Sequence, residues 1–407
     1  MNIKNINHKI MAGAIGLLFA FNIQAGDLTD EEKLGKRLYK DTNLSLNKNQ
    51  SCESCHSLKR VKLFDNEKTE AAGFVDPENV ATGSPTSQGS IEGLFGGLNS
   101  PSAGYASFSP DFHFNSAEGL WVGGQFWNGR AATLEEQAKG PFLNPVEMAM
   151  PSRWAVITEL KKNSRYVKAF KKLYRFDLDR VPANSMAASD KNAPTSVHRA
   201  YNLLAKAIAQ FERSRQLNPF TSKFDFVSAG LTQFTAQEQL GMELFTGKAQ
   251  CSQCHVLDPV EGADGKTYPP VFTDFTYDNI GVPRNHSIPG NPLPDIGLSA
   301  TTGNQEDDGK HKVMSLRNIA VTAPYAHNGF FRTLEHIVHF YNTRDVASEG
   351  WAAPEIPQNL NVSELGNLGL SPEEEDAVVA FMRTLTDDYQ KWGNDPNLSH
   401  KEKSPYY

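Results

Sequence analysis

The sequence has few cysteines, no long hydrophobic run and no excess of basic residues. Only 4 of 407 residues are cysteine, which excludes a disulfide-rich scaffold. The longest apolar run covers about 14 residues, at 10–23, and is shorter than the roughly 20 that a membrane-spanning helix needs. Lys and Arg number 40 against 47 Asp and Glu, a net charge of −7, so no basic field exists for nucleic acid. A soluble, two- or three-domain enzyme or carrier is expected, with no membrane span.

The first 25 residues have the pattern of a secretory signal peptide. Lys4 and Lys9 precede the apolar run, and Gln24 and Ala25 follow it. We therefore predict a signal peptide at 1–25 and a mature, periplasmic protein with a net charge of −9, because the segment removes two lysines and no acid. An uncleaved anchor is the alternative.

All cysteines fall in two copies of one motif, Cys-x-x-Cys-His, at 52–56 and 251–255. Two thiols one helical turn apart can form thioethers with haem vinyl groups, and the histidine that follows can reach the iron. A zinc module would need its two pairs much closer in sequence, and a thioredoxin-type motif would need a βαβ setting. We predict two covalent c-type haems. The predicted attachment residues and iron ligands are Cys52, Cys55 and His56 for one haem and Cys251, Cys254 and His255 for the other.

The sequence around these motifs repeats once. A capping box begins an apolar-periodic segment before each motif, at Thr29 and at Thr235, and the closing segments 207–213 and 377–383 match each other. The predicted fold class is mainly α, with two cytochrome c-like domains at 26–216 and 217–407, each around one covalently bound haem. The segments 83–107 and 258–300 are predicted to be long ordered loops over the haem edges or variable insertions.

Two stretches, 125–148 and 315–329, resemble the bacterial di-haem cytochrome c peroxidases and the related MauG proteins. The first reads QFWNGRAATLEEQAKGP and continues to NPVEM, and the second contains SLRN and TAPYAHNG. The resemblance implies that the haem of the N-terminal domain cleaves hydrogen peroxide. It also implies that the haem of the C-terminal domain relays electrons from a small c-type cytochrome or cupredoxin, with Trp127 bridging the two.

The resemblance also assigns residues above the peroxide-binding iron. Glu147 matches the family's acid/base carboxylate, which can move a proton from the inner to the outer peroxide oxygen, and Gln137 and Pro141 match its neighbours. The residues alone favour a plainer account, in which Asn144 caps a helix that starts with Pro145. On the residues alone, Trp127 is likewise expected to be an aromatic of the hydrophobic core.

A calcium ion is implied between the domains. Asn99 and the carbonyl groups of Thr322 and Pro324 match the family's ligands for it, and such oxygen donors suit this hard cation. A simple turn at Asn99 is the alternative.

Three departures from the peroxidase pattern bear on function. No histidine lies between His56 and His113, so the peroxide-binding iron should be open without reductive activation. The sixth ligand of the relay haem, a methionine in those peroxidases, aligns with Tyr341 in the MauG-like register. On a helix from Thr333, Tyr341 shares the apolar face, while His336 and His339 should be solvated. The MauG tryptophan just before the second motif is replaced by 249–250, Ala-Gln. His311 has no expected role.

Three functions remain open at this stage. The first is a periplasmic di-haem peroxidase that takes electrons from a small donor protein. The second is a MauG-like oxidase that uses peroxide to modify a tryptophan or tyrosine of a partner protein, a role that an anionic tyrosine ligand and its lower haem potential would favour. The third is an electron carrier without turnover. A homodimer is also left open.

Overall fold

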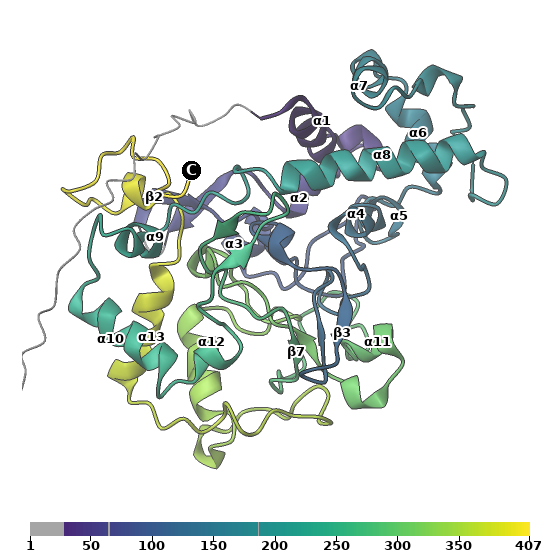
Figure 1. The fold of residues 1–407 in the computed structure, drawn as a ribbon. Helices are drawn as coiled ribbons and strands as arrows, with labels where there is room; N and C mark the ends of the chain where they lie inside the picture. Colours follow the sequence, from purple (N-terminus) through teal and green to yellow (C-terminus); the bar gives the residue numbers. More distant parts are fainter. Residues whose placement is uncertain (1–27, 64–65, 186) are drawn as a thin grey trace, which may run out of the picture.

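The computed structural model describes residues 28–63, 66–185 and 187–407, and the predicted signal peptide lies outside them. The described chain is mainly helical, as predicted (Figure 1). No helix in these segments is long and apolar enough to cross a membrane. The α-helices are α1 Asp30–Tyr39, α2 Cys52–Cys55, α3 Pro77–Thr82, α4 Leu134–Gln137, α5 Gly140–Leu143, α6 Arg153–Leu160, α7 Ser164–Tyr174, α8 Thr195–Glu212, α9 Lys223–Ser228, α10 Ala236–Thr246, α11 Ser299–Thr302, α12 Leu334–Thr343, α13 Pro372–Arg383 and α14 Tyr389–Trp392.

The remaining regular structure is short. The 3-10 turns are η1 Thr42–Leu44, η2 Ala106–Phe108, η3 Leu178–Arg180, η4 Cys251–Gln253, η5 Gln305–Asp307, η6 Ile319–Val321 and η7 Ala347–Glu349. The strands form antiparallel pairs: β1 Arg60–Leu63 with β2 Asn66–Ala72, β3 His113–Asn115 with β4 Leu120–Val122, β5 Val260–Glu261 with β6 Thr267–Tyr268, and β7 Tyr277–Asp278 with β8 His311–Lys312.

The internal repeat is built as two equivalent helix crossings, α1 on α8 and α10 on α13. Both leading helices begin with the predicted capping boxes, at Thr29 and Thr235. At the crossing points, Gly35 faces Ala207 and Gly241 faces Ala377, where an added Cβ would lie 1.9 and 1.8 Å from the facing carbonyl oxygen. Glycine is therefore required for these helices to approach so closely.

Each crossing belongs to its own buried apolar cluster. The first cluster draws its buried residues from 34–217, and the second from 224–385. Figure 1 shows α10, α12 and α13 packed together on one side of the molecule and α1 against α8 on another. The long loops predicted at 83–107 and 258–300 contain only short regular elements: η2 and α11 begin in their last two residues, and β5, β6 and β7 have two residues each.

A buried carboxylate joins the two halves of the chain. Asp387 accepts hydrogen bonds from the Tyr105 hydroxyl at 2.9 Å, from the Thr221 backbone N–H at 2.9 Å and from Asn318 Nδ2 at 2.8 Å. Burial raises the pKa of Asp387 to about 6. Because its donors come from both halves, this acid fixes one half against the other.

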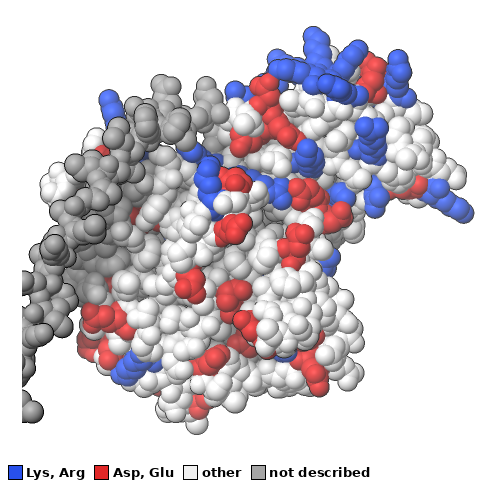
Figure 2. Space-filling model, in the orientation of Figure 1, with Lys and Arg blue, Asp and Glu red and all other residues white. Residues whose placement is uncertain are grey.

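Charge is distributed unevenly over the surface. Residues 151–216 contain 14 Lys and Arg but only 5 Asp and Glu, although the whole chain is acidic. Figure 2 shows the basic side chains gathered at the end of the molecule that carries α7. Acidic side chains are more frequent over the rest of the visible face.

One predicted local structure is wrong. Asn144 and Pro145 do not begin a helix, because residues 145–148 form a turn in which the Glu147 N–H donates to the Asn144 carbonyl at 3.1 Å. The Asn144 side chain still accepts from the Val146 N–H, at 3.2 Å. The short-range capping contact forms, but the chain turns away at Ala149, whose φ of +58° is left-handed.

Candidate haem sites

The first Cys-x-x-Cys-His motif opens onto a cavity of about 280 Å³. Both thiols come from the single turn of α2, and His56 follows directly. The other walls come from the loop 96–103, from the segment 125–148 and from Ile208 and Glu212 of α8. Neither Cys52 nor Cys55 is in a disulfide, so both thiols are available.

The surroundings of His56 suit an iron ligand. The Tyr39 hydroxyl donates to the His56 carbonyl at 2.7 Å, which fixes the backbone, and Ser100 Oγ lies 3.5 Å from Nδ1. Burial lowers the pKa of His56, which keeps the imidazole neutral. A neutral ring held at Nδ1 leaves Nε2 free to bind a metal.

The three residues assigned to the peroxide-binding face lie together in this cavity. Gln137 ends α4, Pro141 is in the first turn of α5, and Glu147 follows in the turn after it. Asn144 Nδ2 donates to Glu147 Oε1 at 2.5 Å. Burial raises the pKa of Glu147, although this hydrogen bond and the charge of Arg130 act in the opposite direction. Glu147 therefore exchanges its proton closer to neutral pH than an exposed glutamate does.

Two more ionisable residues in this cavity were not predicted. Arg130 lies over the Phe126 ring, with 3.6 Å from the guanidinium carbon to the ring centroid, and donates to Asn128 Oδ1 at 3.1 Å. Glu212 is buried, its Oε2 has no hydrogen-bond partner, and burial raises its pKa to about 8. Arg130 falls inside the motif already quoted, whereas only the fold reveals that Glu212 faces the cavity.

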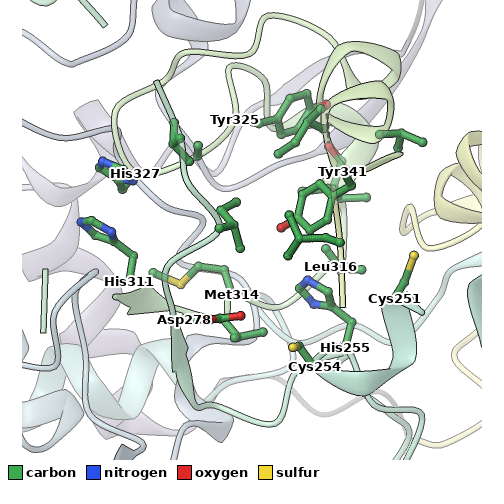
Figure 3. A pocket seen from close by; sticks show the side chains of 18 of the residues that line it. Cys251, Cys254, His255, Asp278, His311, Met314, Leu316, Tyr325, His327 and Tyr341 are labelled. Atoms are coloured by element: carbon green, nitrogen blue, oxygen red, sulfur yellow. Dashed lines mark hydrogen bonds between the residues drawn. The ribbon is translucent and has the colours of Figure 1, made fainter. Parts of the chain in front are cut away.

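The second motif opens onto a separate cavity of about 230 Å³. Its thiols lie in and after η4, and neither is in a disulfide. His255 Nδ1 lies 2.9 Å from the Phe272 carbonyl, the usual arrangement for a metal-ligating imidazole. Burial lowers the pKa of His255 to about 4. Figure 3 shows Cys251, Cys254 and His255 at one end of this cavity.

Tyr341 lies in the wall of the second cavity, on α12. The helix begins after Thr333, as predicted, and its residues Leu334, Ile337 and Val338 line the same cavity. Figure 3 shows the Tyr341 hydroxyl pointing into the cavity, toward the side that His255 occupies. Burial raises the pKa of the Tyr341 phenol.

His336 and His339 are not among the residues that line this cavity, as predicted, but they are not fully solvated. The His336 ring stacks on Trp351 with 5.4 Å between ring centroids. His339 pairs with Glu375 at 3.0 Å and with Glu349 at 3.3 Å. Both side chains are partly exposed, because Trp351 packs against this side of the helix.

A stacked pair of imidazoles, His311 and His327, forms another part of the second cavity. Their rings are parallel, with 3.6 Å between centroids (Figure 3). His311 Nε2 lies 2.9 Å from Asp295, and His327 Nε2 lies 3.2 Å from Glu355. No role was expected for His311, because Asp295 and His327 each lie 16 positions away from it in the chain.

The two cavities share one wall, which contains Trp127 and the residues 99–102. Trp127 Nε1 donates to the Asn99 carbonyl at 2.9 Å, which fixes the indole in that wall. The resemblance implies a bridging role for Trp127, and the structure places this residue beside both cavities.

Three residues expected at a calcium ion also meet in the second cavity. Asn99, Thr322 and Pro324 all line it. The Asn99 Nδ2 donates to the Pro85 carbonyl at 3.1 Å, which orients the side-chain amide.

A separate group, Cys254, Asp278 and Glu364, brings potential metal-ligand atoms within 4.8 Å of one another. The Cys254 thiol, however, is a predicted haem attachment.

Both cavities fit a c-type haem. Each has two unpaired thiols and a histidine whose Nδ1 faces a protein oxygen, and the walls around them are largely apolar. Haem binding requires this combination of attachment, ligation and water exclusion.

Comparison with known proteins agrees with this arrangement. Residues 29–233 match the family described as di-haem cytochrome c peroxidase. The chain is 36% identical to the methylamine utilization protein MauG of Paracoccus denitrificans, over 87% of this chain and 88% of that protein. It is 29% identical to the cytochrome c peroxidase Ccp of Escherichia coli, over 90% of this chain and 61% of that longer protein.

A solved structure gives the same result. The crystal structure of the diheme peroxidase BthA of Burkholderia thailandensis aligns with a TM-score of 0.73 and 29% identity, over 93% of this chain and 91% of that one. The chain belongs to the di-haem cytochrome c peroxidase and MauG family, and it is an oxidoreductase that acts on hydrogen peroxide.

Proposed function

We propose that this protein reduces hydrogen peroxide in the periplasm at a haem held by Cys52, Cys55 and His56. The observation that carries the proposal is the position of Glu147, a half-buried residue in a cavity whose described walls contain no histidine other than His56. When bound, the haem iron would supply the position at which peroxide binds and the electrons that reduce it.

In this proposal the chain's own residues handle the protons. Glu147 takes the proton of the inner peroxide oxygen and returns one to the outer oxygen, which then leaves as water. Asn144 holds the carboxyl group in place through its 2.5 Å hydrogen bond. Gln137 and Pro141 shape the same wall of the cavity.

The second haem, attached through Cys251 and Cys254 and bound by His255 and Tyr341, would serve electron transfer. Support comes from Tyr341 and His255 lining one cavity and from Trp127 lining both. The N-terminal domain, 26–216, would be peroxidatic and the C-terminal domain, 217–407, would relay electrons from a small c-type cytochrome or cupredoxin. The separate apolar clusters support this division. A calcium ion at Asn99, Thr322 and Pro324 would tie the domains together.

A second candidate is MauG-like oxidation of a tryptophan or tyrosine in a partner protein. Tyr341 favours it, because an anionic phenolate stabilises oxidised iron and lowers the potential of its haem. Such a haem would be a poor electron acceptor for a high-potential cytochrome.

The test begins with the mass of the purified, secreted protein, which should exceed that of the cleaved chain by two haem masses. Replacing both Cys52 and Cys55 by Ala should remove one of them. Peroxide consumption is then measured with reduced cytochrome c or a reduced cupredoxin as donor. Turnover with either donor supports the peroxidase. A protein that binds two haems but consumes no peroxide with any reductant would instead be an electron carrier.

A further inference from the structure

The β3–β4 hairpin exposes an unusual number of aromatic and aliphatic side chains. Phe114 is 50% exposed and Leu120 is 42% exposed, and Trp121 beside them is half-buried. A two-stranded hairpin has no core of its own to explain such residues. Apolar groups gathered at the surface often mark a site of interaction.

The aromatic rings of this hairpin form a continuous stack. Phe112 and Trp121 lie face to face, with 4.7 Å between ring centroids and 3° between ring planes. Phe114 meets the same indole edge to face at 5.3 Å. The rings therefore run without a gap from an exposed position, Phe114, to the base of the hairpin at Phe112.

The base of this stack packs against the turn that carries Trp127. Phe112 and the Tyr277 hydroxyl both pack closely against Gly129. A Cβ added at Gly129 would lie 2.7 Å from Phe112 Cε2 and 2.4 Å from Tyr277 Oη. The Phe112 N–H donates to the Ala132 carbonyl at 2.9 Å on the far side of the same turn. Gly129 is two residues from Trp127, the residue in the wall shared by both cavities.

The two indoles differ in their N–H groups. Trp127 Nε1 donates to the Asn99 carbonyl, whereas the Trp121 indole makes no hydrogen bond within the described part of the chain.

The hairpin's own charges are acidic, since Asp111 and Glu118 are exposed and residues 111–122 contain no Lys or Arg. An approaching cationic or neutral aromatic molecule would meet a favourable field, and an anion would be repelled.

We propose that Trp121 is a redox-active surface residue at which a small aromatic amine delivers electrons to the peroxide reaction. Trp121 first loses one electron inward, along the Phe112 stack toward Trp127, and an amine stacked on the exposed rings then reduces the oxidised Trp121 by one electron. Two amines are oxidised to their radical cations for each hydrogen peroxide, which takes up the two electrons and two protons to give two water molecules. This inference rests on the proposed function for the reduction of peroxide.

The experiment uses the holoprotein and N,N,N′,N′-tetramethyl-p-phenylenediamine, whose radical cation is coloured. Trp121→Phe keeps the apolar ring but removes the readily oxidised indole. Most amine oxidation should be lost in this variant, while the absorbance change that peroxide alone causes keeps its wild-type rate. The matched control is Trp154→Phe, which removes a tryptophan on α6 whose indole donates to the Pro182 carbonyl and should leave both rates unchanged.

A second measurement does not depend on turnover. Peroxide added without a reductant should leave oxygen on the peptide that contains Trp121, and the amine should protect that peptide. Full amine oxidation by Trp121→Phe, or a Trp121 peptide that stays unmodified, would overturn the inference. Failure of the proposed function looks different, because the wild-type protein would then show no absorbance change with peroxide.

Discussion

Asn144 donates its side-chain amide to Glu147 Oε1 at 2.5 Å, inside a cavity that His56 also lines. The two residues are three apart, and the turn between them replaces the helix start that their types suggest. The hydrogen bond orients a carboxyl group whose pKa burial raises. A cap-like contact thus serves to position a candidate acid/base group.

Replacing this group should slow the reaction with peroxide. Glu147→Gln keeps the shape and the contact with Asn144 but removes the base, so the absorbance change on mixing with peroxide should slow by about a hundred-fold to ten-thousand-fold. Stopped-flow mixing measures it. Glu212→Gln is the matched control, because Glu212 lines the same cavity from α8. A wild-type rate in Glu147→Gln would leave this residue a purely structural role.

Tyr341→Phe should change the spectrum and the potential of one haem only. Loss of an anionic oxygen ligand removes a group that stabilises oxidised iron, so the potential of that haem should rise and its low-spin EPR signal should change. Redox titration and EPR are the measurements. Tyr325→Phe is the control, since Tyr325 lines the same cavity but donates its hydroxyl to the Ile319 carbonyl. Unchanged spectra in Tyr341→Phe would mean that another residue, or none, binds there.

The two helix crossings make a paired prediction about stability. Gly35→Ala and Gly241→Ala each force a methyl group against the backbone of the facing helix. Overpacking of this kind costs about 1 to 3 kcal/mol, so both variants should lose that much free energy of unfolding in urea titrations. Gly140→Ala should lose little, because its Cβ would make only an ordinary contact, 3.4 Å from the Phe126 ring. Equal stability of all three variants would show that the helices can separate without cost.

Glu212 should make stability depend on pH. Its pKa is raised from 4.5 to about 8 by burial, so between these values the folded protein keeps a proton that the unfolded chain releases. Stability should therefore fall as pH rises through this window. Glu212→Gln is always neutral, so its melting temperature should match the wild type near pH 4.5 and exceed it increasingly up to pH 8. Melting curves that stay parallel over this range would mean that Glu212 is ionised in the folded protein.

The local elements could be read from the sequence because their signals lie within a few residues. The capping boxes at Thr29 and Thr235 each begin a helix at the predicted position. The two haem motifs are equally local, since the thiols and the histidine occupy five consecutive positions. The helical period also placed Tyr341 on the apolar face of its helix, because burial follows that period.

What the sequence by itself determined, then, is the mainly helical class, the repeat and the two Cys-x-x-Cys-His motifs. The tertiary structure decided which distant groups meet. It turned the chain at Glu147 instead of starting a helix, brought Glu212 of α8 to the first cavity and stacked His311 on His327. The physical reason is that burial and long-range hydrogen bonds act between groups far apart in the chain. No spacing within the sequence records those contacts.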